Sequence, residues 1–362
     1  MSYFEYFCAN IERKNSDEIK GTCNSMCPQD EVTMREKERL VHVLEVLGPK
    51  RMLVKTYRRS AADSNMALPR NLRPYPVLRD TVHYLLLDVT KRTDVSTACV
   101  YDFLNDRLRA VRQDMTIQRL CPENCASLLE PMIRFYVYYG YRLCELPIKD
   151  YDPVLNKKYL LECMKWFLTC KKNEKMEISS LFSNMNITYK LKCDRVLIES
   201  LYLLCNLDDL HPLYRYLTLP KDLKSHPQLK LAYSIAVANL KGNFVQVCKL
   251  MDRLCPLTFC ALCIYLPVLQ RKALLVLSHA YSSKSLSVPA AALRRWLRYN
   301  SDGDAMDACA HYGVAVQASG GVVRFGKEFK HDVATLQPMK LLNLDKDVDL
   351  SVDNVFTYTV SY

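Results

Sequence analysis

The segment Gly321-Val-Val-Arg-Phe-Gly326-Lys327 matches the phosphate-binding pattern Gly-x4-Gly-Lys. A phosphate-binding loop of this kind has Ser or Thr directly after the Lys to hold Mg²⁺, and a helix begins there with its N-terminus facing the phosphates. Glu328 stands in the place of that hydroxyl, and the residues between the glycines are typical of a β-strand. We therefore interpret the segment as a strand and turn of a small domain, and we do not expect a nucleotide site.

The sixteen cysteines suggest a disulfide framework or a zinc site. The first residues lack the basic and apolar segments of a secretory signal, so we expect a reducing compartment in which the thiols are free. Zinc usually takes four ligands from two pairs. Cys23 and Cys27 form one pair with no second pair near it, and the other group (Cys255, Cys260 and Cys263) lies in the most apolar part of the chain. We expect structural thiols, with no metal and no cofactor.

The histidines, seven in all, accompany no motif for hydrolytic, metal-dependent or dinucleotide chemistry, so we do not expect an enzyme. The net charge of +11 suits an anionic partner, which is either nucleic acid or an acidic protein. The low glycine content, 9 of 362 residues, disfavours nucleotide-binding folds and predicts a mainly helical chain. The uncharged stretch 254–269 is shorter than the about 20 residues of a membrane span. We interpret it as a buried helix and expect no membrane contact.

Two basic regions are candidates for partner contact. Between residues 50 and 79 the cations face a single acid, Asp63, which is too few for an internal ion-pair lattice. This region is interpreted either as an anion-binding face or as a docking site for an acidic partner, and its cations are Lys50, Arg51, Lys55, Arg58, Arg59, Arg70, Arg73 and Arg79. Along residues 102–119 acids and bases alternate closely, which indicates an internal lattice that holds helices together.

The elements that must position these residues follow from hydrophobic periodicity. The spacing of apolar residues predicts a helix over 95–119, whose apolar face needs a partner surface. Acids near residue 30 predict the start of another helix, with no breaker before Gly48. Further along, helices alternate with short breaks, as at Gly242, where glycine permits a left-handed turn and Asn243 can cap the next helix.

The part of the chain after residue 280 changes character. A helix begins at Pro289, a second follows Ser301, and two strands flank the turn at Gly320 and Gly321, an order typical of a winged helix. Acids open the second helix and would repel phosphates, so we do not expect it to read a DNA groove. The cations elsewhere in this part are candidates for sequence-independent nucleic-acid binding: Lys284, Arg294, Arg295, Arg298, Arg324, Lys327 and Lys330.

Three blocks of sequence, in this order, resemble a known family. They are Gly21-Thr-Cys-Asn-Ser-Met-Cys-Pro28, then Leu72-Arg-Pro-Tyr-Pro-Val-Leu-Arg-Asp80, then the segment from Phe103 to Gln118. Together they resemble the Sac-three/GANP family, and most closely its small animal members, over residues 20–330. The residues of these blocks that we interpret as structural are Cys23, Cys27, Pro28, Arg35, Arg107, Arg109, Arg112, Gln113 and Asp114.

The resemblance implies a mainly α fold, a TPR-like or PCI-like helical superhelix followed by a C-terminal winged helix. We expect an extended N-terminal segment (1–30), a helical repeat domain (31–280), the winged helix (281–335) and an acidic, extended or loosely ordered C-terminal tail (336–362).

The resemblance also implies a non-enzymatic scaffold that pairs with a PCI-domain protein and a small acidic protein. That assembly, TREX-two-like, would bind RNA and serve mRNA export, in the nucleus and cytoplasm. The alternative, taken from the small animal members, is a mitotic scaffold in centrosome duplication and spindle assembly that acts through protein–protein contacts only.

Overall fold

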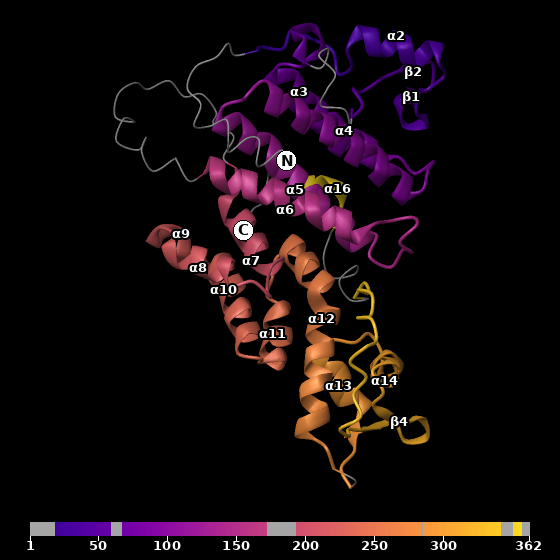
Figure 1. The fold of residues 1–362 in the computed structure, drawn as a ribbon, viewed down its shortest axis with the longest axis vertical. Helices are drawn as coiled ribbons and strands as arrows, with labels where there is room; N and C mark the ends of the chain where they lie inside the picture. The colour runs from indigo at the N-terminus through magenta and orange to yellow at the C-terminus, as the bar shows by residue number, and fades with distance from the viewer. Residues whose placement is uncertain (1–18, 59–66, 172–192, 284, 342–349, 357–362) are drawn as a thin grey trace. The chain divides into compact units, whose positions relative to one another are not determined.

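The structure is a computed structural model that describes residues 19–58, 67–171, 193–283, 285–341 and 350–356. It is mainly helical, which confirms the predicted class (Figure 1). The chain forms two compact units. The first comprises Met1–Tyr139, Ile148–Asp194 and Ser351–Tyr362, and the second comprises Gly140–Pro147 and Arg195–Leu350. The boundaries predicted at residues 30, 280 and 335 stay a prediction.

Helices dominate the first unit. Its elements are α2 (Gln29–Lys37), η1 (Val43–Glu45), β1 (Val46–Leu47), β2 (Lys50–Arg51), η3 (Pro69–Asn71), α3 (Tyr75–His83), η4 (Tyr84–Asp88), η5 (Val89–Lys91), α4 (Thr97–Ile117), α5 (Pro122–Arg142), α6 (Pro153–Cys170) and α16 (Val352–Phe356). The two strands pair antiparallel, with Val46 opposite Arg51 and Leu47 opposite Lys50. The last residues of α5 lie in the second unit.

Helix α4 is the helix predicted over 95–119, and the structure confirms it. The Ser96 hydroxyl caps its first turn by accepting a hydrogen bond from the Cys99 amide at 3.2 Å. Its apolar stripe (Leu104, Leu108, Val111 and Met115) has no solvent exposure. Polar side chains also bind α4 to its neighbours, because Tyr136 of α5 donates to Asn105 at 3.0 Å. A helix with so little exposed surface is fixed from all sides.

The helix predicted from residue 30 towards Gly48 is shorter than expected, because α2 ends at Lys37. Arg39 then adopts a left-handed conformation with φ 56°. The reason is the buried ion pair between Arg35 and Glu45. A continuous helix would separate these two residues by about 15 Å along its axis, whereas the observed turn brings the carboxylate onto the guanidinium.

The second unit begins with a series of helices and ends with a small mixed module. Its elements are α7 (Arg195–Leu204), α8 (His211–Thr218), α9 (Lys221–Ser225), α10 (Pro227–Leu240), α11 (Phe244–Met251), α12 (Pro256–Ala280), β3 (Val288–Pro289), α13 (Ala290–Leu297), α14 (Asp302–His311), β4 (Ala315–Gln317), η8 (Ala318–Gly320) and β5 (Val322–Arg324).

The break between α10 and α11 confirms the predicted helix–turn–helix. Gly242 has φ +69°, and the Asn243 side chain accepts a hydrogen bond from the Gln246 amide at 3.0 Å. Helix α12 is long and apolar enough to cross a membrane by length and composition alone, but 61% of its most apolar window is buried within the structure. Such burial is typical of the core helix that the sequence predicts.

The module after α12 contains the two predicted helices and the predicted hairpin of β4 and β5. A third strand, β3, was not predicted, and it completes an antiparallel sheet of order β3-β5-β4. Pro289 lies in β3 and caps α13 instead of starting it, because its neighbour Val288 pairs with Val323. The module shares an apolar core with α12. Leu293, Leu297 and Val323 of the module and Ala273 and Leu274 of α12 all have no exposure in this core.

The predicted acidic tail has two described parts. Residues 336–341 form no helix or strand, whereas Val352–Phe356 form a short helix in the first unit, α16, that the sequence did not predict. The Phe356 ring meets Tyr138 edge-on with centroids 5.8 Å apart, and Arg134 donates to the carbonyl of Val355 at 3.3 Å. These contacts explain why the helix forms, because Val355 and Phe356 of the tail are buried against the first unit. The predicted tail residues 342–349 and 357–362 lie outside the described ranges.

Candidate functional site

Glu45 is the centre of a buried polar cluster in the first unit. Its carboxylate accepts hydrogen bonds from Arg35, from Arg107 at 3.3 Å, and from the backbone amides of His42 and Val54, each at 3.0 Å. Burial favours the protonated acid, but the Arg35 hydrogen bonds, the Val54 amide and Arg107 outweigh it and lower the pKa of Glu45. The ionised carboxylate therefore links α2, α4 and the backbone between these two helices through hydrogen bonds and ion pairs.

Asp114 on α4 is the centre of a second buried cluster. It has no solvent exposure, and it pairs with Lys55 Nζ at 2.6 Å and with Arg73 Nε at 2.7 Å. The Arg73 side chain is also fully buried and donates to the carbonyl of Met26 at 3.3 Å. Asp114 thus binds two segments, around Lys55 and around Arg73, that are both far from α4 in the sequence.

The basic region from Lys50 to Arg79 is therefore not a continuous solvated face. Lys55 and Arg73 are interior. Most of the acids that pair with this region come from α2 and α4, and a count of acids within residues 50–79 missed them. Other cations also have partners: Arg58 with Glu31, Arg70 with Asp30, Arg51 with Glu36 and Arg79 with Asp80. Lys50 is exposed, and Arg59 lies outside the described residues. An anion-binding or docking face stays a prediction for the exposed members.

Other charged and polar side chains of α4 that belong to the third block also contact neighbouring segments. The Arg109 guanidinium lies between the rings of Tyr57 and Tyr159, 3.8 and 4.9 Å from their centroids. Two more arginines of α4 form ion pairs, Arg107 with Asp106 and Arg112 with Glu162. The Gln113 side chain donates a hydrogen bond to the carbonyl of Arg58. The structure thus brings the alternating charges of this helix into a lattice that holds segments together.

Gln118 and Gly21 were not singled out by the sequence, yet they tie the first block to the other two. The side-chain amide of Gln118 donates a hydrogen bond from Nε2 to the carbonyl of Arg73 at 2.8 Å. Its Oε1 accepts a hydrogen bond from the backbone amide of Gly21, also at 2.8 Å. A Cβ at Gly21 would lie 2.3 Å from the carbonyl oxygen of Leu72, so only glycine fits this crossing. Gly21 and Gln118 lie within the first and third blocks, and this position in the sequence could have identified them as structural residues.

The two cysteines of the first block are buried and close to these clusters. Cys23 donates to the carbonyl of Ser25 at 3.2 Å. Burial, together with the charge of Glu31, raises the pKa of Cys27 to about 12, which keeps its thiol protonated at neutral pH. Within the described ranges, no group of three or more His, Cys, Asp or Glu residues is placed to hold a metal ion.

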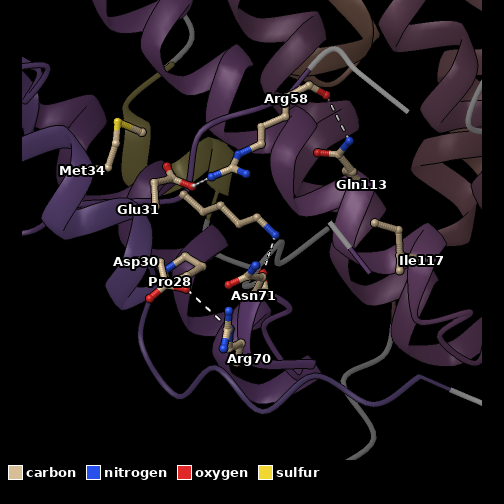
Figure 2. A pocket seen from close by; sticks show the side chains of 10 residues that line it. Pro28, Asp30, Glu31, Met34, Arg58, Arg70, Asn71, Gln113 and Ile117 are labelled. Carbon is tan, nitrogen blue, oxygen red and sulfur yellow. Dashed lines mark hydrogen bonds and ion pairs between the residues drawn. The ribbon is translucent and has the colours of Figure 1, made fainter. Parts of the chain in front are cut away.

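A cavity of about 200 Å³ opens beside this lattice, between α2, η3 and α4 (Figure 2). It is lined by Pro28, Asp30, Glu31, Met34, Lys55, Arg58, Arg70, Asn71, Gln113 and Ile117. Figure 2 shows its charges paired across the wall, Glu31 with Arg58 at 3.7 Å and Asp30 with Arg70 at 3.5 Å. No histidine, cysteine, serine or threonine is among the lining residues. This cavity was not predicted from the sequence.

The predicted nucleic-acid residues of the C-terminal module fall into two groups. Two are held in ion pairs, Arg294 with Asp302 at 3.2 Å and Arg298 with Asp252 at 2.6 Å. The others are exposed and form no ion pair within the described part of the chain: Arg295, Arg324, Lys327 and Lys330. Lys284 lies outside the described residues. The exposed group comes from α13, β5 and the residues that follow β5.

Comparison with known proteins extends this description. The sequence model of the SAC3/GANP family matches residues 26–318. The chain is 27% identical over 329 residues to Protein xmas of Drosophila melanogaster, which covers 86% of the chain and 15% of that protein.

Two shorter matches cover about a third of the chain each. SAC3 family protein B of Arabidopsis thaliana is 35% identical over 133 residues, 35% of the chain and 8% of that protein. SAC3 family protein 1 of Schizosaccharomyces pombe (strain 972 / ATCC 24843) is 32% identical over 130 residues, 34% of the chain and 13% of that protein. The chain thus spans 15% or less of the length of each of these relatives.

Proposed function

The chain belongs to the SAC3/GANP family, and from this premise we propose that it is a non-enzymatic scaffold linked to mRNA export. In this proposal it pairs with a PCI-domain protein, and with a small acidic protein, to form an RNA-binding module. The helices before residue 280 form a TPR-like or PCI-like superhelix, and residues 281–335 form a winged helix. The nucleus and the cytoplasm are the compartments proposed.

The element order of the C-terminal module is the observation that carries this proposal. A strand, two helices and a hairpin follow one another, and the first strand pairs with the last, as in a winged helix. Four exposed cations on this module form no ion pair within the described part of the chain, and a cationic surface favours the phosphates of RNA by releasing counterions.

The charge of α14 restricts how RNA would bind. Asp302 and Asp304 lie in its first turn, and Asp304 closes a capping box with Ser301. Carboxylates at this position repel phosphates, so insertion of α14 into a nucleic-acid groove is unfavourable. The proposed contact therefore runs over α13 and the hairpin and does not depend on base sequence.

A charge-reversal variant of the full chain tests this proposal. Arg295→Glu with Lys327→Glu removes two exposed cations without breaking an ion pair. If about six phosphates are neutralised, the slope of log K against log salt for single-stranded RNA is near −4 for the wild type. With four contacts left, the variant should have a slope of about −3 and a weaker affinity at every salt concentration. Fluorescence anisotropy with labelled oligo(U) measures both.

A matched control keeps the same net charge. Lys221→Glu with Lys230→Glu reverses two exposed lysines of α9 and α10 in the same unit, outside the module. This control should bind RNA with a slope close to that of the wild type. Equal losses in the two double variants, or RNA binding by the wild type that salt does not change, would exclude the module as the RNA site.

A second candidate, a mitotic scaffold that acts through protein contacts only, is favoured by a different observation. The basic region of the first unit has two of its cations, Lys55 and Arg73, buried against Asp114. Its remaining charge is too interrupted to follow an RNA backbone, whereas a protein partner needs only local complementarity. This candidate predicts partner binding that nuclease treatment leaves unchanged.

A further inference from the structure

A cluster of exposed apolar side chains lies after α2, around η1 and the β1–β2 hairpin of the first unit. Its members, with their exposed fractions, are Leu40 (59%), Val43 (49%), Val46 (38%), Leu47 (37%) and Met52 (36%). Figure 1 shows α2, β1 and β2 next to one another. Single exposed apolar residues are common on proteins, whereas several of them on one piece of paired backbone make that piece a candidate interaction site. We call this group the hairpin surface.

The hairpin surface is held from below by the Glu45 cluster. Leu44 and Glu45 have no solvent exposure and lie between the exposed Val43 and Val46. The carbonyl of Glu45 accepts a hydrogen bond from the Met52 amide at 2.8 Å. On the other side, Arg92 donates to the carbonyl of Val46 at 3.2 Å. The backbone that presents the apolar side chains is therefore ordered before any partner binds, and this lowers the entropy cost of association.

The charges around the hairpin surface are mostly positive. Four exposed cations (Lys37, Arg39, Lys50 and Arg51) face two exposed acids (Glu36 and Glu38). Arg51 and Glu36 pair with each other at 3.3 Å, so the other three cations face one acid. The strand register places a cation opposite each apolar residue of β1, Arg51 opposite Val46 and Lys50 opposite Leu47. Apolar side chains next to cations are complementary to a segment that carries apolar side chains and carboxylates.

We propose that the hairpin surface docks a short segment of a partner protein that has two or more apolar side chains flanked by Asp or Glu. RNA fits this surface poorly, because all five side chains of the hairpin surface are aliphatic and offer no ring on which a base can stack. The proposal does not depend on RNA binding by the C-terminal module, since every residue that it uses lies in the first unit.

Differential selection from a random 12-residue peptide display library tests the proposal. The library is selected on the full wild-type chain and, in parallel, on the full chain with Val46→Asp and Leu47→Asp. Clones enriched only on the wild type should combine apolar residues with Asp or Glu. Synthetic peptides from those clones should bind the double variant at least about tenfold more weakly, as expected for loss of a central contact. Lys50→Glu alone should weaken binding severalfold, and added salt should weaken binding to the wild type.

A control variant makes the result specific. Ile148→Asp with Val154→Asp changes two side chains of the same unit that are 72% and 74% exposed and lie outside the hairpin surface. This variant should bind the selected peptides as the wild type does. If the Val46→Asp, Leu47→Asp chain loses its thermal transition, the Lys50→Glu chain decides the outcome.

Several outcomes would overturn the proposal. Recovery of the same clones on both chains, enrichment of basic clones, or an equal loss in the control variant would show that the surface does not select acidic–apolar segments. If oligo(U) competes for the selected peptides, RNA is the occupant instead. If the double variant converts a dimer to a monomer in sedimentation velocity, the occupant is a second copy of this chain.

Discussion

Glu45 shows how one buried carboxylate can organise a segment that has little regular structure. Between α2 and β1 the backbone is held mainly by bonds that end on its two oxygens, from Arg35, Arg107 and two backbone amides. Removing one partner from a buried ion pair leaves uncompensated charge and costs about 3–5 kcal/mol. The stability of the first unit should therefore depend strongly on this side chain.

The Glu45→Gln variant tests this dependence and its pH profile. The pKa of Glu45 is lowered in the folded chain, so its ionised form adds stability above the unfolded pKa of about 4.3. That contribution is lost as the pH falls through the lower, folded pKa. At neutral pH the variant should be about 3–5 kcal/mol less stable than the wild type, and this difference should shrink below about pH 4. Urea unfolding across a pH series measures it.

The Glu36→Gln variant is the matched control for this prediction. Glu36 pairs with Arg51 at 3.3 Å, but the two side chains are 42% and 57% exposed. Exposed ion pairs contribute about 0–1 kcal/mol, so this variant should unfold close to the wild type at every pH. A Glu45→Gln loss no larger than that of Glu36→Gln would show that the cluster does not hold the segment.

At the scale of elements, α16 is a helix that its own sequence cannot maintain. Isolated helices shorter than about 12 residues are marginal in water, and α16 runs only from Val352 to Phe356. Its helical form must therefore come from its seat in the first unit, where Phe356 is 3% exposed.

Phe356→Ala should release α16 from that seat. Burial of a phenylalanine is worth about 1.5–3 kcal/mol, and each 1.4 kcal/mol is a tenfold change in an equilibrium constant. Amide hydrogen exchange at Val355, which donates to the carbonyl of Ser351 at 3.0 Å, should become at least about tenfold faster. Asp353→Asn removes an ion pair with Lys91 at 2.8 Å between side chains that are 50% and 60% exposed. Exposed ion pairs contribute about 0–1 kcal/mol, so this variant should change the exchange much less. Unchanged exchange in Phe356→Ala would mean that other contacts fix the helix.

The elements that the sequence predicts well are those defined by local patterns. The length of α4, the turn at Gly242 and the hairpin of β4 and β5 depend on neighbours only a few residues apart. The end of α2 and the docking of α16 depend on partners distant in sequence, such as Glu45 for the first and Tyr138 for the second. Periodicity carries no information about those partners.

The candidate sites follow the same division. The sequence shows which residues are charged, but not which of them meet. Asp114 lies 59 residues from Lys55 and 41 from Arg73, so a count of acids within the basic region could not find it. The cavity of Figure 2 is likewise built from four separate segments, and no single motif contains it.

At the scale of the whole molecule, the cations behind the net charge of +11 lie in different environments in the two units. In the first unit, cations such as Arg35, Arg73 and Arg107 are interior and hold segments together. In the second, the C-terminal module leaves cations such as Arg295 and Lys327 exposed. Net charge alone therefore does not distinguish an RNA-binding scaffold from one that binds only proteins.

Affinity purification of the tagged full chain from cell lysate, with and without RNase, separates the two candidate functions. If the RNA-binding module is the function, RNA should co-purify with the wild type and be reduced with the Arg295→Glu, Lys327→Glu chain, while a PCI-domain protein stays bound to both. If protein contact alone is the function, the two chains should retain the same proteins after RNase and carry equal amounts of RNA. Loss of every protein partner on RNase treatment would contradict the protein-only scaffold, and retention of partners without any PCI-domain protein would contradict the module. The Lys221→Glu, Lys230→Glu chain, purified in parallel, controls for the change in net charge.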